Sequence, residues 1–491
     1  MVRIPAATVY GFREPTKLGD PFPLFSRIQI PKATYPAEFV ERIEKIKTIH
    51  NPEAGMSYSD EWAVLAIKVS ITRFWACSTA VIRLACPLTD PDLPLPALPA
   101  HPEMPMAIEM GYDDNLYQLP KELKRVFTGY VDTISYKLTP KRVIAIIALR
   151  DPIRFLVDNK LTRLYDSQNL SEFTVTGEGT GQSITLSGPR TLLIQRLIVD
   201  GSGTFEDGTT PAIPDTRIVI PDPSERLPIQ PITTDTPTDT SSGSQSKVLQ
   251  VYNVMNRFPI EVIKHLSSVE GSPRELFADE YGLVHWEKRR TRNIDVPKDY
   301  WFRNPIQMES SLTRGITPIL TGSMEWSTIG TMTEFVVVNA DFNKGGTSGG
   351  SVGIMGRMQP TSALGFDMAS RTRFVFDDTI QNGEAEVAGA AFLNAMLMLW
   401  GKDVQAGSIE FEGDPEILPG EAIRVWNMGV YPPPDNIFRT EAVVHSYTAT
   451  GPKRGYYTNI MFSSTEASLV DKYTATTFSV DQTVNANTSE G

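Results

Sequence analysis

The sequence predicts a β-rich α+β protein in which a β-rich insertion and a small mixed α/β module lie between two β-barrel domains. Two observations lead to this fold class. Strand-like runs gather in two regions, about 1–165 and 306–465. Proline accounts for 37 of 491 residues, above the average of roughly 5%, and extra proline is typical of chains with many turns and edge strands. The length also fits two or three domains, each with its own core.

The first region, 1–165, is expected to form a small barrel or closed sheet. Between Trp62 and Asp151 it contains strand-like runs separated by turn residues. From Val126 to Tyr136, every second residue is expected to share one face. Gly129 lies in this run, where we expect a close backbone approach or a β-bulge. The runs are "WAVLAIKVSITRFW", "STAVIRLAC", "MPMAIEMGY", "RVFTGYVDTISYK" and "RVIAIIALRD".

Asp151 ends the last of these runs and precedes "PIRFLVDNKL". An aspartate N-cap followed by proline at the first helical position is a common helix start. The sequence therefore predicts a helix that begins at Pro152, and it gives Asp151 a structural role.

The middle of the chain divides into three predicted segments. Residues 166–227 are a β-rich insertion with strand-like pieces that include "TLLIQRLIV". Residues 228–246, rich in Thr, Ser, Asp and Pro, are a linker or surface loop. Residues 247–305 are a small mixed module of helix and hairpin, in which Pro259 breaks or kinks the helical stretch.

The second β region, 306–465, is expected to form the second barrel. One helix interrupts it, at "GEAEVAGAAFLNAMLMLW", where apolar residues recur at helical spacing and predict a face that packs on the sheet. The two β regions show no convincing direct sequence repeat. The remaining residues, 466–491, are polar and are expected to form a loose tail, or one that a partner orders.

Two turns stand out in the second region, within "GSIEFEGDPEILPGEAIRVWN". Gly413, Asp414 and Pro415 predict a turn after the first strand of this stretch. Pro419 and Gly420 fit the two central positions of a type II turn before the next strand. Neither turn carries a residue placed for chemistry.

Composition argues against several classes of function. The formal net charge is −12, whereas a nucleic-acid surface needs clustered Lys and Arg. The five histidines are scattered and the two cysteines, Cys77 and Cys86, are predicted to be small buried residues, so we expect neither a metal nor a cofactor site. No apolar run approaches the roughly 18 residues of a membrane span, so no stable membrane association is expected.

Carboxylate pairs offer one route to catalysis. Glu275 with Asp279, or Asp113 with Asp114, could in principle serve glycoside hydrolysis. Because the chain has 58 acidic residues, such pairs arise by chance, and we predict that the protein is not an enzyme and has no catalytic residue.

Three stretches together resemble the baseplate hub proteins of contractile phage tails, the late-control protein D family, which are similar to the hub portion of type VI secretion spike proteins. The first stretch is "MAIEMGYDD" with "VFTGYVDTISY" and "RVIAIIALRDPIRFL". The second is "IEFEGDPEILPGEAIRV". The third is "FRTEAVVHSYTATGPKRGYYTNIMF", in which His445 and Tyr447 precede a loop and Gly455 and Tyr457 open the closing strand.

The resemblance implies two barrel domains similar to tail-tube subunits and a homotrimer, so that three chains form a pseudo-sixfold ring. Such a hub joins the sixfold tail tube, or a tube-initiator protein, to a threefold spike protein. Baseplate wedge and tape-measure proteins are further expected partners, and DNA would only pass through the channel. The expected location is the virion tail baseplate, after assembly in the host cytoplasm.

Three hypotheses arise from the sequence. The first is the trimeric structural hub, whose spike would be a separate chain because no spike repeat follows the hub region. The second is a tail-tip peptidoglycan hydrolase or glycan-binding module, which the acidic pairs and aromatic residues motivate. The third is a cellular β-rich binding protein, which would be a monomer.

Overall fold

The computed structural model describes residues 5–12, 22–28, 62–73, 75–87, 98, 100–112, 122–139, 142–161, 188–205, 210–220, 228–229, 258–268, 274–289, 297–301, 317–327, 334–339, 354–358, 372–377, 404–426, 437–449 and 454–464. The predicted helix at 383–400, most of the linker at 228–246 and the tail at 466–491 lie outside these ranges.

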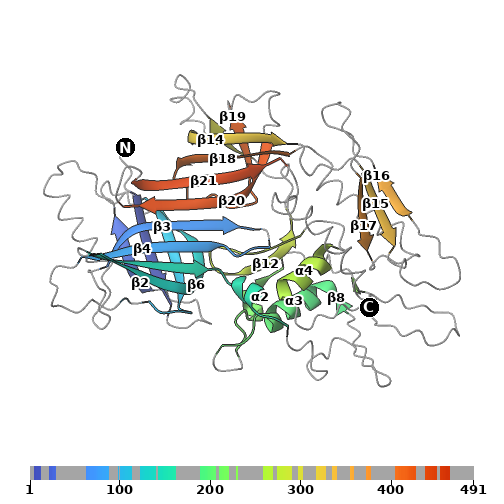
Figure 1. Cartoon of the computed structure of the whole chain (residues 1–491), viewed down its shortest axis with the longest axis horizontal. Coiled ribbons are helices and arrows are strands. Elements are labelled where there is room, and N and C mark those ends of the chain that lie inside the picture. The colour runs from blue at the N-terminus through green and yellow to red at the C-terminus, as the bar shows by residue number, and fades with distance from the viewer. Residues whose placement is uncertain are drawn as a thin grey trace.

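A single 13-stranded sheet dominates the fold (Figure 1). Its strand order is β19-β13-β14-β18-β21-β20-β3-β4-β7-β6-β5-β1-β2. The strands are β1 (Pro5–Gly11), β2 (Phe22–Ile28), β3 (Ala63–Thr72), β4 (Thr79–Pro87), β5 (Pro105–Tyr112), β6 (Glu122–Thr139), β7 (Arg142–Arg150), β13 (Lys298–Trp301), β14 (Thr317–Ser327), β18 (Val404–Glu412), β19 (Ala422–Trp426), β20 (Ile437–Thr448) and β21 (Gly455–Ser463).

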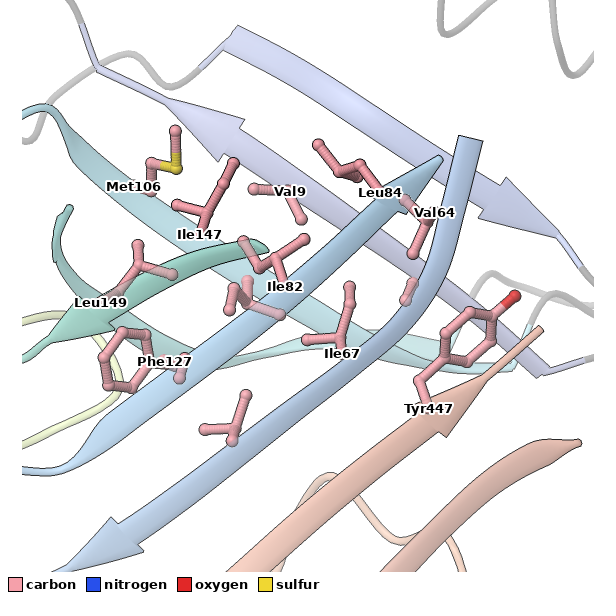
Figure 2. Close-up of a cluster of buried hydrophobic side chains, with 14 of the residues drawn as sticks. Val9, Val64, Ile67, Ile82, Leu84, Met106, Phe127, Ile147, Leu149 and Tyr447 are labelled. Atoms are coloured by element: carbon pink, nitrogen blue, oxygen red, sulfur yellow. The ribbon is translucent and has the colours of Figure 1, made fainter. Parts of the chain in front are cut away.

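The first seven strands, β1 to β7, form what we call the first β unit. Its inner face carries a large apolar cluster, because inward residues alternate with outward ones along each strand. On β7, for example, Val143, Ala145, Ile147 and Leu149 are buried, and the residues between them are half-buried. Figure 2 shows part of this core, including Ile82, Leu84 and Phe127.

The second β unit comprises β13, β14 and β18 to β21, and it is a closed six-stranded barrel. Closure comes from the additional pairing between β19 and β20, in which Ile423 lies opposite Phe438. The interior is filled by apolar side chains of several strands. They include Tyr300, Ile409, Phe411, Ile423, Val425, Phe438, Val443, Ile460 and Phe462.

A smaller module packs beside the two β units (Figure 1). Its apolar cluster joins three helices to a three-stranded sheet of order β11-β12-β9. The elements are α2 (Arg154–Asp158), α3 (Arg190–Gly201), the 3-10 helix η2 (Asp215–Arg217), α4 (Pro259–Ser268), β9 (Ile218–Val219), β11 (Arg274–Ala278) and β12 (Val284–Lys288).

Two further sheets are short. Strand β8 (Gly188–Pro189) pairs with β10 (Pro228–Ile229). In the other sheet, β15 (Glu334–Asn339) lies between β16 (Ile354–Met358) and β17 (Thr372–Asp377). No helix among the described residues is long and apolar enough to cross a membrane.

The prediction of strand for "TLLIQRLIV" is wrong, because this stretch belongs to helix α3. Among the described side chains of α3, Ile194, Leu197 and Ile198 are buried apolar residues, at the i, i+3, i+4 spacing of a helix face. A dense run of β-branched and leucine residues fits both the period of a strand and the period of a helix. The prediction followed strand propensity, and tertiary packing favours the helix instead.

The two β units repeat one topology. In the first, five consecutive antiparallel strands have the order β3-β4-β7-β6-β5, and in the second the order is β14-β18-β21-β20-β19. The strands of each set also follow one another along the chain in the same way: the spatial positions are occupied by the first, second, fifth, fourth and third strand of the set. Strand β6 therefore corresponds to β20, and β7 to β21. The hairpins have matching registers, with Tyr136 opposite Ala145 and Tyr447 opposite Tyr456.

The correspondence between the two β units extends to individual residue pairs. In both hairpins a Ser-Tyr pair, Ser135-Tyr136 and Ser446-Tyr447, lies at the same register, and residues 137–144 and 448–455 form connections of equal length between each tyrosine and its partner. Likewise, Ile108 lies opposite Phe127 as Ile423 lies opposite Phe438. The sequence shows no convincing repeat because most of the other corresponding positions carry different residues.

Candidate functional site

The two β units meet through one pair of strands, which we call the β3–β20 interface. Here β20 pairs antiparallel with β3, from Ala442 opposite Thr72 to Thr448 opposite Ala66. The main sheet is therefore continuous across both units, and Figure 1 shows β21, β20, β3 and β4 stacked in succession. Main-chain pairing of this kind satisfies the polar groups of both strand edges.

Two tyrosines of the second β unit pack into the core of the first β unit at the β3–β20 interface. Tyr447 lies opposite Ile67 and is fully buried in the core of the first β unit, although β20 belongs to the second (Figure 2). Tyr456 joins the same core, with its ring centroid 5.8 Å from that of Tyr112. Each such ring adds a large apolar area to the contact.

His445 lies in this interface, opposite Val69, and is fully buried. Its Nδ1 is 2.8 Å from the Tyr456 hydroxyl and 3.2 Å from Thr458 Oγ1. Burial disfavours the imidazolium and lowers the pKa of His445 to about 3. The ring is therefore neutral at physiological pH, and its role is in packing and hydrogen bonding.

A buried ionic cluster lies where the module joins the β3–β20 interface. At its centre is Glu275 of β11, 1% exposed. Its Oε1 accepts a hydrogen bond from Arg439 of β20, and its Oε2 lies 3.5 Å from Nε of Arg73, which follows β3. Arg289 Nε is 3.9 Å from Glu275 Oε1. One carboxylate thus contacts cations from both β units and from the module.

Two more carboxylates complete this cluster. Glu287 of β12 pairs with Arg73, and Glu441 of β20 accepts a hydrogen bond of 2.9 Å from Arg289. Buried charges are tolerated only when they are paired in this way, because desolvation of an unpaired ion costs several kcal/mol. The cluster therefore fixes how the module sits against the two β units.

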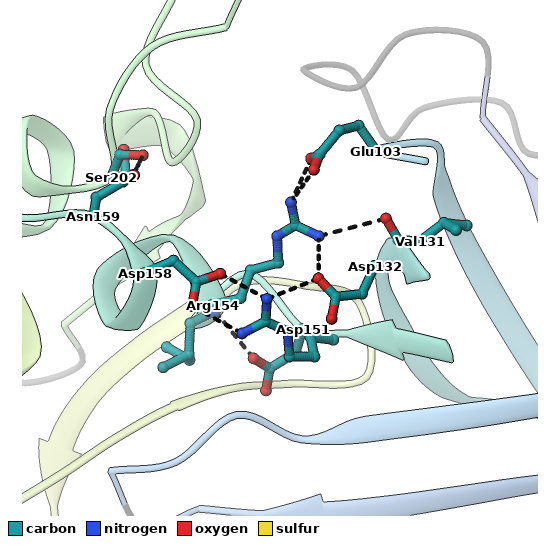
Figure 3. A network of polar contacts seen from close by, with 10 residues as sticks. Glu103, Val131, Asp132, Asp151, Arg154, Asp158, Asn159 and Ser202 are labelled. Carbon is teal, nitrogen blue, oxygen red and sulfur yellow. Dashed lines mark hydrogen bonds and ion pairs between the residues drawn. The ribbon is translucent and has the colours of Figure 1, made fainter. Parts of the chain in front are cut away.

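A second ionic network holds helix α2 against the first β unit (Figure 3). Arg154 of α2 pairs with Glu103 and lies 3.5 Å from Asp132 Oδ1. Arg150 of β7 bridges Asp132, at 2.7 Å, and Asp158, at 2.6 Å. Asp132 is the extra residue of a β-bulge in β6, as Glu441 is in β20. Each bulge thus presents a carboxylate to arginine side chains, Arg150 and Arg154 for Asp132 and Arg289 for Glu441.

Asp151 is fully buried between β7 and α2. Its Oδ2 accepts a hydrogen bond of 2.8 Å from the Ser78 backbone N–H, and its Oδ1 one of 3.0 Å from Ile153 N–H. Burial raises the pKa of Asp151 to about 7, against the effect of these two bonds. The helix begins at Arg154 and not at Pro152, because residues 151–153 form a hydrogen-bonded turn first.

Three of the glycines that the sequence singled out lie where a side chain has no room or the backbone is left-handed. A Cβ at Gly129 would lie 2.5 Å from Arg150 O, and one at Gly413 would lie 2.1 Å from the Tyr456 ring. Gly420 has φ +92°, and Glu421 N–H bonds to Leu418 O at 3.5 Å, as in a type II turn.

The other residues that the sequence singled out, Asp414, Pro415, Gly455 and Tyr457, lie in strand β21 or in the turn hydrogen-bonded to it. Asp414 N–H donates to Thr458 Oγ1 at 2.9 Å, and Asp414 Oδ1 accepts from Glu416 N–H, so Pro415 lies inside an Asx turn. Gly455 has φ +138° at the start of β21. The Tyr457 hydroxyl donates to Arg454 O at 3.3 Å. These residues support the hairpin that carries Tyr447 and Tyr456.

Of the two candidate acidic pairs, Asp113 and Asp114 lie outside the described residues, and Glu275 with Asp279 does not form an open site. Glu275 is enclosed by the arginines of the buried ionic cluster. Asp279 closes the turn between β11 and β12: its Oδ1 accepts hydrogen bonds from Tyr281 and Leu283 N–H, and its Oδ2 lies 3.0 Å from His285 Nε2. Among the described residues, no group of three or more His, Cys, Asp or Glu side chains could hold a metal ion.

Sequence reasoning missed the buried ionic cluster. A charged run such as "EKRR", residues 287–290, is typical of a solvated loop, yet Glu287 and Arg289 are both buried. The available signal was alternation on β12, because Trp286 and Lys288 lie on the opposite side from Glu287 and Arg289. Only the tertiary structure shows that Arg439, from a distant strand, completes the cluster.

No family model matches the chain, and no curated protein matches it by sequence. Solved phage tail proteins are nevertheless similar in structure. The 43 kDa tail protein of prophage MuSo2 from Shewanella oneidensis is 12% identical with a TM-score of 0.51, over 84% of this chain and 96% of that one. A tail protein from Neisseria meningitidis MC58 is 11% identical with a TM-score of 0.47, over 82% and 92%. Prophage tail protein gp18 from Listeria monocytogenes EGD-e is 12% identical with a TM-score of 0.45, over 86% and 94%.

The similarity to the MuSo2 tail protein shows the fold. The β-rich class and the resemblance to phage tail proteins that the sequence predicted are thus confirmed at the level of the fold. Fold alone does not assign a function, which depends on the particular surfaces of the chain.

Proposed function

We propose, from this shared tail-protein fold, that the chain is a structural virion protein: a homotrimeric baseplate hub that joins the sixfold tail tube to the threefold spike and surrounds the DNA exit channel. The observation that carries the proposal is the repeat of one five-strand topology in two fused β units. Three such chains present six similar units around a threefold axis, so one ring can contact a sixfold partner and a threefold partner.

The proposal implies a set of protein partners and a location. On one side the ring contacts the tail tube or a tube-initiator protein, and on the other a separate spike chain. Baseplate wedge and tape-measure proteins lie within reach of such a hub. The formal net charge of −12 suits a channel protein, because negative surfaces do not retain passing DNA. The hub resides in the virion tail baseplate after assembly in the host cytoplasm.

The state of the acidic pair favours this structural role over the peptidoglycan hydrolase. Glycoside hydrolysis needs two carboxyl groups on either side of an accessible sugar ring. Glu275 is 1% exposed and paired with arginines, and Asp279 is engaged by two backbone N–H groups and a histidine. Both carboxyl groups therefore already have structural partners.

Mass measurement of the purified protein, alone and with tube and spike proteins, tests the proposal. We expect a species of three chains, and a cryo-EM map of it should show six β units around the axis. A monomer that persists with both partners present contradicts the hub. Peptidoglycan turnover that Glu275→Gln or Asp279→Asn abolishes would instead support the hydrolase.

A further inference from the structure

Two strand edges of the main sheet lack a strand partner among the described residues. Strand β6 pairs with β5 only up to Tyr130, whereas its pairing with β7 on the other side continues to Thr139. Strand β14 pairs with β13 only at Thr317 and Pro318, and with β18 as far as Ser327. In Figure 1 these two strands lie toward opposite ends of the stack of strands. Unpaired edges of this length are templates for a further strand.

Large apolar side chains are exposed at the same two edges. Tyr136 and Leu138 of β6 are 55% and 70% exposed, and Leu320 of β14 is 52% exposed. Tyr136 lies opposite Ala145 and Leu138 opposite Val143, both buried residues of the inner face. Tyr136 and Leu138 therefore extend the apolar face of the first β unit beyond the end of its core.

The β3–β20 interface shows what such edges do within one chain. Strand β20 corresponds to β6, and it pairs with β19 up to Arg439 and then with β3 from Ala442 onward. Strand β3 corresponds to β14. The unpaired edges of β6 and β14 are thus the same two surfaces that are already joined inside the chain.

We propose that β6 of one copy pairs antiparallel with β14 of a second copy, in the register of the β3–β20 interface. This proposal rests on the proposed function, because it supplies the contact between chains of the hub ring. Since His445 lies opposite Val69 and Ser446 opposite Lys68, the equivalent register places Ile134 opposite Gly322 and Ser135 opposite Thr321.

Burial of equivalent residues supports this pairing. Tyr447 is fully buried because β3 covers it, whereas its counterpart Tyr136 is exposed. Ala449, the counterpart of Leu138, packs against the core of the first unit. In the proposed contact, Tyr136 and Leu138 pack against Ile319 and Leu320 of the second copy and lose their exposure to water.

The outward sides of the two edges are also compatible. Thr133 and Ser135 on β6 face Ser323 and Thr321 on β14 in the proposed register, so the pairing opposes small hydroxyl side chains and brings no like charges together. The contact is head to tail, which lets copies close into a ring; pairing of β6 with β6 would end at a dimer.

Cysteine cross-linking tests the register in the full chain. In Ser135→Cys/Thr321→Cys, opposite Cβ atoms come within about 5 Å, so mild oxidation should give covalent multimers on a non-reducing gel. The control is Ser135→Cys/Glu325→Cys, which moves one cysteine along the same strand face by four residues, about 13 Å. Multimers in the first variant and few in the control support the register. Equal cross-linking in both, or none in either, overturns it.

A charge at the edge tests the contact independently of the register. Tyr136→Glu should reduce the multimer fraction at least tenfold by mass measurement, whereas Tyr281→Glu, an equally exposed tyrosine at 54%, should leave it unchanged. A wild-type trimer that Tyr136→Glu does not disturb overturns the inference and leaves the hub intact. A wild-type monomer, with tube and spike proteins present, overturns both. If Tyr136→Glu keeps the multimer but no longer binds the tube protein, the β6 edge is the contact for that partner, and the inference is also overturned.

Discussion

Tyr447 lies opposite Ile67 across the β3–β20 interface, and it belongs to the core of the first β unit although its strand belongs to the second. Its counterpart in the repeat, Tyr136, is the exposed tyrosine of the β6 edge. The same position in the repeat is thus covered by strand β3 in the second unit, where it is Tyr447, and exposed in the first unit, where it is Tyr136. The fusion of the two units depends on this kind of contact.

Tyr447→Ala should therefore destabilise the joined β units. Removal of a buried aromatic side chain costs about 3–5 kcal/mol through lost burial and the cavity left behind. Denaturant unfolding followed by circular dichroism measures the loss. Tyr281→Ala, at an exposed turn, serves as the control and should change stability by less than about 0.5 kcal/mol. Equal effects in the two variants would contradict the assigned role of Tyr447.

Glu275→Gln should be strongly destabilising, because it removes the negative charge that Arg73 and Arg439 share. Breaking a buried ion pair costs about 3–5 kcal/mol. The control is Glu416→Gln, since Glu416 pairs with Lys124 and both side chains are more than half exposed. That change should cost no more than about 1 kcal/mol. Faster proteolysis of Glu275→Gln near the module would locate the effect, whereas equal stability of the two variants would contradict it.

Much of the fold was accessible from sequence because it depends on local alternation. The strands around Gly129 and the turn at Pro419 and Gly420 follow from period-two patterning and turn chemistry. The β3–β20 interface was not accessible, because strand pairing between residues nearly 400 positions apart leaves no local pattern. The buried cluster of Glu275 was missed for the same reason: its partner Arg439 differs from a surface arginine only in tertiary context.

Gly413→Ala should disrupt the hairpin that carries Tyr456. A Cβ at position 413 would lie 2.1 Å from the Tyr456 ring, so the ring or the backbone must move. Overpacking of this kind typically costs about 1–3 kcal/mol. A double-mutant cycle with Tyr456→Leu checks the cause, since the smaller side chain should relieve part of the Gly413→Ala penalty. Strictly additive effects would place the cost of the substitution elsewhere.

Stability should depend on pH with opposite signs at His445 and Asp151. The pKa of buried His445 is lowered to about 3, so between this value and 6.5 only the unfolded chain binds the proton. The wild type should therefore lose its advantage over His445→Gln as the pH falls through this window, by roughly 1.4 kcal/mol per pH unit.

The pKa of Asp151 is raised to about 7, so the folded chain holds that proton more tightly. Relative to Asp151→Asn, the wild type should thus lose stability as the pH rises from about 4 to 7. Denaturant midpoints measured across pH for all three proteins give both differences, and a pH-independent difference for either variant would contradict the burial argument for that residue.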